Sequence, residues 1–166
     1  MPNSVILGAL AASLLGLAAD HPLDRRVVDI AGPGDAHSEE AHGYAGHDVV
    51  AGVANGRAFR KARGWMHYAL TTFDDTEVTV ALTFLATDSV PRSYDLIVED
   101  SLIVTRRFTA GSSALNVVEH TVPFVLTKGK SSIAVVIRGR DGLSPAVHEI
   151  RTVQDHYEVN FPGIAR

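Results

Sequence analysis

Apolar residues recur at every second position along most of this chain, and this period constrains what it can fold into. In the segment Val78 to Phe84, apolar side chains alternate with Thr79, Ala81 and Thr83. Successive side chains of an extended strand point to opposite faces, so the pattern predicts strands with one buried face. The same alternation predicts strands in residues 26–32, 65–70, 94–98, 102–109, 116–124, 131–138 and 146–153.

Turn-forming segments rich in Gly, Pro, Asp and Ser separate these runs at short intervals. Strands do not alternate with helical segments, and no long internal repeat is visible. About seven or eight short strands at this spacing are typical of an all-β fold, an antiparallel β-sandwich or jelly roll. Residues 33–56, rich in Gly, His and acidic residues, are predicted to be a long loop. Such loops in compact domains are usually functional or mobile.

Length and charge exclude several classes of protein. The 166 residues suffice for one domain with a substantial core. The formal net charge is −4 and no run of Lys or Arg occurs, which argues against a nucleic-acid partner, because neutralising phosphates requires a basic surface. Cysteine is absent, so disulfides, thiolate zinc sites and thiol nucleophiles are excluded.

The N-terminal segment 5–19 has no charged residue, is rich in Ala and Leu, and ends in small residues before Asp20. It is short for a membrane span and suits the apolar region of a signal peptide. We therefore expect a signal-like segment at residues 1–19, a sandwich domain at residues 20–166, no stable membrane span, and a secreted or cell-surface protein. The alternative is a retained apolar helix, because Ala and Leu are strong helix formers.

Three pieces of the chain, all lying between residues 26 and 153, resemble the C-terminal β-sandwich of glycoside hydrolase family 127 β-L-arabinofuranosidases. They are the loop containing Pro33, Gly34, Ser38, Glu39 and His42, the segment Arg60 to Tyr68, and the segment Tyr94 to Ile103.

This resemblance implies a fold related to galactose-binding-like and carbohydrate-binding modules. It carries no catalytic residue across, because the family's Cys-rich zinc site belongs to a separate barrel and this sequence has no Cys. The usual Asp-Gly hairpin turn of such domains corresponds to Asp100-Ser101 here.

The polar residues of the 33–56 segment allow two interpretations. In the first, a carboxylate–arginine bond from Glu39 to Arg60 or Arg63 fixes the loop to the sheet, and Ser38 and His42 complete the network. In the second, imidazole and carboxylate groups bind a transition metal or Ca²⁺. The alternative ligands are Asp35, His37, Glu39, His42 and His47. We expect no cofactor, with Ca²⁺ as the alternative.

Trp65 is the only tryptophan and alternates with Met66, so it lies on the mixed face of its strand. Together with His42, Tyr44 and Arg60 it could form a patch that binds a glycan. The competing interpretation is that Trp65 packs at the edge of the core beneath the long loop, because Trp is usually well buried.

Catalysis has little support, because no nucleophile-elbow, zinc-protease or phosphate-loop motif occurs. Adjacent Glu119 and His120 point to opposite faces of a strand, and His120 is predicted to be a hydrogen-bonded core histidine. The sequence favours a secreted, non-catalytic β-sandwich that acts by glycan or protein contact, with self-association expected. The alternatives are a structural subunit of an extracellular oligomer or filament that keeps its N-terminal segment, and a metal-dependent glycan-active enzyme that uses the His/Glu loop.

Overall fold

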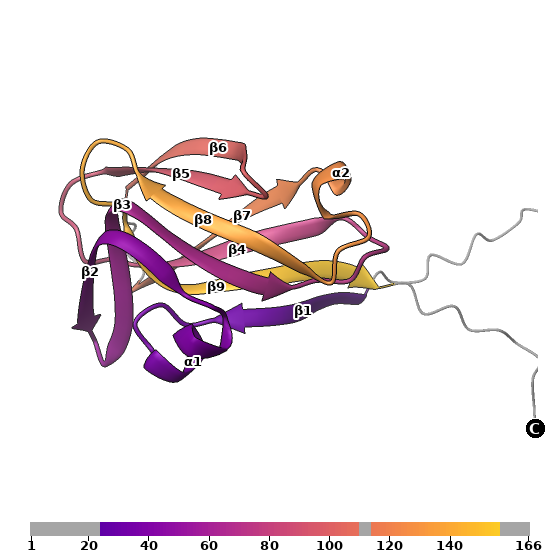
Figure 1. The fold of residues 1–166 in the computed structure, drawn as a ribbon. Coiled ribbons are helices and arrows are strands. Elements are labelled where there is room, and N and C mark those ends of the chain that lie inside the picture. The colour runs from indigo at the N-terminus through magenta and orange to yellow at the C-terminus, as the bar shows by residue number, and fades with distance from the viewer. Residues whose placement is uncertain (1–23, 110–113, 157–166) are drawn as a thin grey trace, which may run out of the picture.

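The computed structural model describes residues 24–109 and 114–156 (Figure 1), so the predicted signal-like segment lies outside the described residues. In this part of the chain, nine strands pair only in antiparallel fashion and form a β-sandwich, which confirms the predicted fold class. The elements are β1 (Asp24–Ala31), α1 (Ala36–Ala41), β2 (Ala45–Ala54), β3 (Arg57–Thr71), β4 (Val78–Leu85), β5 (Arg92–Val98), β6 (Ser101–Phe108), β7 (Leu115–Val122), α2 (Phe124–Thr127), β8 (Ser132–Gly139) and β9 (Ala146–His156). Neither helix is long and apolar enough to cross a membrane.

The strands lie in two layers. The layer that we call the β8 sheet has the order β6-β5-β8-β3-β2, and the layer that we call the β4 sheet has the order β7-β4-β9-β1. One residue pair, Arg60 with Val147, joins β3 to β9 and links the two layers at one edge. In Figure 1 both helices lie beside the sandwich, and neither crosses the face of β8.

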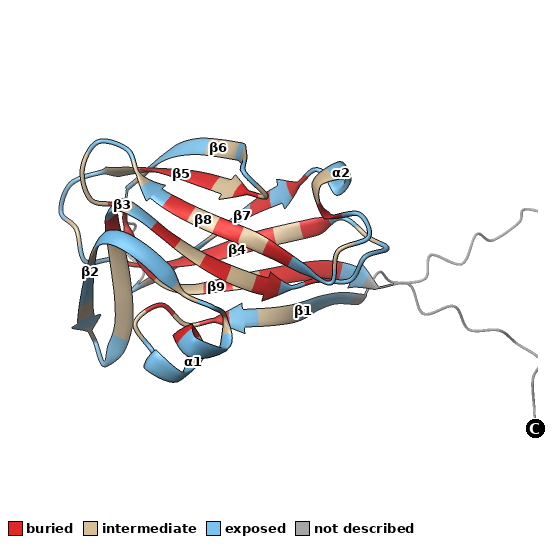
Figure 2. Cartoon of the chain, viewed as in Figure 1, coloured by how far each residue is buried: buried red, intermediate tan, exposed pale blue. Residues whose placement is uncertain are grey.

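The core lies between the layers and is built from the alternating residues that the sequence indicates. Figure 2 shows buried positions repeating along β3, β4 and β8. Burying each such side chain contributes about 1.5 to 3 kcal/mol. The largest fully buried aliphatic and aromatic side chains include Met66, Tyr68, Leu70, Leu82, Phe84, Tyr94, Leu96, Ile133, Ile137 and Ile150.

The predicted long loop at residues 33–56 is wrong, because this segment contains α1 and β2. Asp35 caps α1: its side chain accepts a hydrogen bond of 2.9 Å from the Ser38 N–H. β2 pairs with β3 and forms one edge of the β8 sheet. Most of its side chains are exposed or half-buried, so small residues suffice there and the apolar alternation that marks the other strands is weak.

Two tight turns differ from the sequence prediction, since the first lies at the end of the predicted loop and the second is shifted by one residue. Asn55 and Gly56, with φ of 52° and 73°, form the two-residue turn between β2 and β3. An Asn-Gly pair with both residues at positive φ is the typical signal of a type I′ hairpin. The β5–β6 turn is Glu99-Asp100, with φ of 51° and 62°, and not Asp100-Ser101, because Ser101 already pairs with Val98.

Candidate functional site

Glu39 is the centre of the polar network that holds α1 against the sheet. Its side chain is 9 % exposed. Its carboxylate accepts hydrogen bonds from Nε and Nη2 of Arg60, the latter at 2.7 Å, from the Gly34 N–H at 2.6 Å and from the Tyr68 hydroxyl at 3.3 Å. Of the two arginines suggested as partners, only Arg60 binds Glu39, because Arg63 is exposed and pairs with Asp48 at 3.5 Å.

The electrostatics of this cluster follow from its geometry. Burial opposes ionisation of Glu39, but the hydrogen bonds from Arg60 and Gly34 outweigh it and hold the Glu39 pKa below its ordinary value. The hydrogen bond to Glu39 raises the pKa of Arg60. Burial, with the neighbouring Glu39 charge, raises the pKa of Tyr68. Glu39 and Arg60 therefore form a stable ion pair across the physiological pH range.

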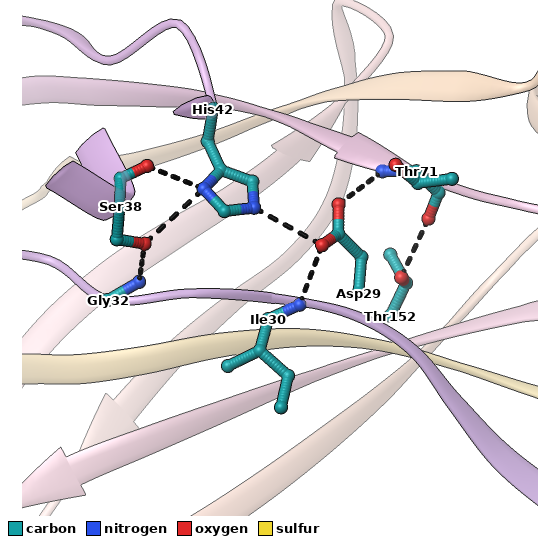
Figure 3. Close-up of polar contacts among 7 residues, drawn as sticks. All are labelled: Asp29, Ile30, Gly32, Ser38, His42, Thr71 and Thr152. Atoms are coloured by element: carbon teal, nitrogen blue, oxygen red, sulfur yellow. Dashed lines mark hydrogen bonds and ion pairs between the residues drawn. The ribbon is translucent and has the colours of Figure 1, made fainter. Parts of the chain in front are cut away.

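His42 ties the end of α1 to β1 (Figure 3). Its Nδ1 lies 2.6 Å from the Ser38 carbonyl oxygen, and its Nε2 lies 3.2 Å from Oδ1 of Asp29. Asp29 also accepts hydrogen bonds from the Thr71 N–H at 2.7 Å and the Ile30 N–H at 2.9 Å. Burial opposes ionisation of Asp29, but these bonds outweigh it and lower its pKa. His42 and Asp29 thus join α1, β1 and the end of β3.

Ser38, His42 and Asp29 have the residue types of a hydrolase triad, but their hydrogen bonds differ from one. In a triad, a His nitrogen accepts the proton of the serine hydroxyl. Here the nitrogen nearest the Ser38 hydroxyl, at 3.3 Å, is Nδ1, which lies closer to the Ser38 carbonyl. A carbonyl oxygen only accepts, so this hydrogen bond requires the proton on Nδ1, and an Nδ1 that donates to the carbonyl is not a base for the hydroxyl. The Ser38 hydroxyl instead accepts a bond of 2.8 Å from the Gly32 N–H.

The alternative metal ligands do not come together. Asp35 caps α1, and Glu39 and His42 take part in the network described above. His37 and His47 are exposed and belong to different elements, α1 and β2. Within residues 24–109 and 114–156, no three His, Asp or Glu side chains form a group that could hold a metal ion.

The four residues suggested as a glycan patch lie on two different faces. Tyr44 packs its ring 5.3 Å from the ring of Tyr68, and the Arg60 guanidinium lies 4.5 Å from the Tyr44 ring centroid. Tyr44 and Arg60 therefore gather with Glu39 at the end of the core, near His42. Trp65 neighbours the fully buried Met66 on β3 and so points to the outer face of the β8 sheet.

The surroundings of Trp65 are set by strand register. Its side chain is 39 % exposed. Trp65 is paired with His47 of β2 on one side and with Arg138 of β8 on the other. Arg138 is paired with Asp95 of β5, and Asp95 with Thr105 of β6. Directly paired residues project from the same face, so these five side chains form one row across the outer face of the sheet.

Asp95 is the buried member of this row and binds the polar side chains around it. Its side chain is 2 % exposed and accepts hydrogen bonds from Arg138 Nη2 at 2.7 Å, Arg140 Nη1 at 3.0 Å and Thr105 Oγ1 at 2.6 Å. Burial opposes its ionisation, but the bonds from Thr105, Arg138 and Arg140 outweigh it and lower its pKa. Both guanidinium groups are therefore fixed at one end while their side chains remain 50 % exposed.

The sequence patterns did not single out this cluster. Arg138 of β8 and Arg140, which follows the end of that strand, are two positions apart and both bind Asp95, and this spacing of two arginines is one signal that could have revealed the cluster. The acidic Asp95 between the buried residues Tyr94 and Leu96 is a second signal, because a charge there needs a partner.

Two further polar sites occur in the described residues, one in the core and one on the surface. His120 is 8 % exposed and its Nε2 lies 2.9 Å from the Tyr94 hydroxyl, which confirms the predicted core histidine. Burial lowers the pKa of His120 and raises that of Tyr94 to about 12. On the outer face of the β4 sheet lies a polar depression of about 360 Å³ without an aromatic side chain. It is lined by Arg25, Glu77, Thr79, Thr121, Val153 and Asp155.

Comparison with solved structures places the fold among carbohydrate-binding modules and domains of glycoside hydrolases. A family 35 carbohydrate binding module from Clostridium thermocellum is 10 % identical, with a TM-score of 0.56, over 75 % of this chain and 98 % of the module. A family 35 module from an environmental isolate is 22 % identical, with a TM-score of 0.54, over 76 % of this chain and 96 % of the module.

An exo-β-1,3-galactanase from Phanerochaete chrysosporium, solved with galactose, is 12 % identical, with a TM-score of 0.53, over 77 % of this chain and 28 % of the enzyme. At these identities the likeness is one of fold. The specific resemblance to glycoside hydrolase family 127 remains a prediction.

The sequence itself was also compared. No curated protein sequence matches the chain. The model of a family of unknown function, DUF6805, matches residues 22–153. This range covers the described sandwich except for the end of β9, residues 154–156. The chain therefore belongs to the DUF6805 family.

Proposed function

We propose that this chain is a non-catalytic module that binds a glycan through the outer face of the β8 sheet. The observation that carries the proposal is the exposed Trp65 ring beside Arg138, whose guanidinium is held by the buried Asp95. A sugar ring offers an apolar C–H face that stacks on an aromatic ring, and hydroxyl groups that bind planar polar groups. Because the arginine is already ordered, little conformational entropy is lost on binding.

The fold supports the same function. The structural neighbours include proteins named as carbohydrate binding modules, and the galactanase was solved with galactose. The polar residues of the α1 region support a non-catalytic role, because the Glu39 carboxylate and both ring nitrogens of His42 already bind other groups of the chain. The apolar residues 5–19 support export, as the sequence predicts.

The test is a binding measurement on the Trp65→Ala variant. Titration calorimetry against a panel of plant and microbial oligosaccharides identifies a ligand for the wild-type protein. We expect Trp65→Ala to weaken that binding by about 2 kcal/mol, or about 30-fold, as for an aromatic residue at the centre of an interface. The matched control is Phe73→Ala, which removes an aromatic side chain of similar exposure, 43 %, between β3 and β4. Unchanged affinity in Trp65→Ala would refute the proposal.

A second candidate function, self-association as a structural subunit, is favoured by the open edge of β2. In the described residues β2 pairs with β3 alone. Its segment from Val49 to Ala54 contains no charged residue and no Pro, and Val53 is 72 % exposed. Edge strands usually carry Lys, Pro or other features that prevent pairing with another chain. We propose that a second copy can pair there in antiparallel fashion.

A further inference from the structure

We infer that the glycan bound by the outer face of the β8 sheet is acidic, and that Arg138 and Arg140 bind its anionic group. The inference rests on the proposed function and deepens it by naming the ligand class.

The first argument is local charge. Arg138 and Arg140 share the single carboxylate of Asp95, so two positive charges and one negative charge leave one net positive charge. Arg107 of β6 is paired with Ser93, two positions from Asp95 along β5, and therefore lies on the same outer face. This positive surface occurs in a chain whose formal net charge is −4. A ligand with negative charge is the partner that complements it.

The second argument is the set of donors that the two arginines present. Arg138 uses Nε and Nη2 to bind Asp95, and Arg140 uses Nη1 to bind Asp95 and Thr105. A guanidinium has five N–H donors, so in the described part of the chain each arginine keeps donors for another group. Their half-exposed side chains present those donors beside the sheet face. Guanidinium groups bind carboxylates in paired hydrogen bonds, which suits an acidic substituent.

The third argument is the position of Trp65. It is directly paired with Arg138, so its side chain begins about 5 Å from that of the arginine. A sugar ring that stacks on Trp65 can therefore direct an acidic substituent toward Arg138 and Arg140. The arrangement provides a stacking surface on β3 and an anion site where Arg138 and Arg140 meet Asp95, both on the same outer face of the sheet.

The deciding experiment compares an acidic oligosaccharide with its own neutral form. Oligogalacturonate and the fully methyl-esterified oligomer differ in charge and keep the same sugar ring. Titration calorimetry on the full chain should show the acidic form binding about tenfold more tightly, and this difference should shrink with added salt. A sulfated oligosaccharide distinguishes a sulfate from a carboxylate as the preferred anion, and a preference for either over the neutral oligomer supports the inference.

Variants identify the residues responsible. Arg140→Gln should weaken binding of the acidic oligomer about tenfold and leave binding of the esterified oligomer unchanged. Arg138→Lys keeps the charge beside Asp95 and should lose part of the affinity, which guards against a folding defect in a Gln variant. Arg25→Gln, on the outer face of the β4 sheet, is the matched control and should behave as wild type.

The outcomes separate the two proposals. Equal binding of both oligomers, abolished in each case by Trp65→Ala, would overturn the acidic-ligand inference and leave glycan binding intact. Binding of neither oligomer nor any other glycan would overturn the proposed function itself. Equal affinity for oligogalacturonate and a single-stranded oligonucleotide would also overturn the inference, because it would show a general attraction of polyanions.

Discussion

Replacing Glu39 with Ala removes the carboxylate that joins α1 to β3, and the structure allows the loss to be worked out. Glu39 accepts four hydrogen bonds, two of them from Arg60. An unsatisfied buried donor costs about 1 to 3 kcal/mol, and breaking a fully buried ion pair costs about 3 to 5 kcal/mol. The Arg60 side chain is 20 % exposed and can turn partly to water, which reduces that figure. We expect Glu39→Ala to lower the free energy of unfolding by about 2 to 3 kcal/mol.

The assay is urea unfolding monitored by circular dichroism, with thermal melting in parallel. A loss of this size should lower Tm by roughly 5 to 10 °C for a domain of this length. Glu40→Ala is the matched control, because Glu40 lies on the same helix, carries the same charge and is exposed. The reasoning fails if the two variants unfold within about 0.5 kcal/mol of each other. Chelator should change Tm less than Glu39→Ala does, and a chelator-induced fall restored by one specific ion would instead establish a metal site.

The same pair gives a pH dependence whose sign follows from the lowered Glu39 pKa. A carboxylate with a folded-state pKa below its ordinary value of 4.5 stabilises the fold above that pH and loses this effect as the pH falls. The difference in unfolding free energy between the wild type and Glu39→Gln should therefore be constant near neutral pH and shrink below about pH 4.5. A difference that stays constant down to pH 3 would show that ionisation of Glu39 plays no part.

Two further predictions concern the β2–β3 hairpin. Gly56→Ala should destabilise the fold by about 1 kcal/mol in urea unfolding, because Gly56 has a φ of 73° that Ala tolerates poorly, and an effect near zero would contradict the assigned turn. Val53→Lys places a charge on the exposed edge of β2 and should abolish any self-association seen by light scattering of the wild-type protein; a wild type that stays monomeric at micromolar concentrations, or a variant that still associates, would exclude the β2 edge.

The all-β fold could be predicted from the sequence because burial on one face imposes a period of two on each strand. In β4 and β8 the alternating Val, Ile, Leu and Phe residues mark the core face directly. β2 gave no such signal, because an edge strand with an exposed surface can be built from Ala, Gly and a few Val residues. Its clearest local mark was the Asn55-Gly56 turn, whose conformation is a property of those two residues alone.

The candidate sites divide in the same way. The resemblance and the opposite charges indicated that Glu39 would bind one of two arginines, but the choice of Arg60 depends on which face of β3 each side chain occupies. Likewise, the sequence showed that Trp65 lies on a mixed face and could not show what lies beside it. Trp65, Asp95 and Arg138 come from three strands, and only the pairing of β3 and β5 with β8 brings them into one row. Local patterns determine the direction of a side chain, whereas the register between distant strands determines its neighbours.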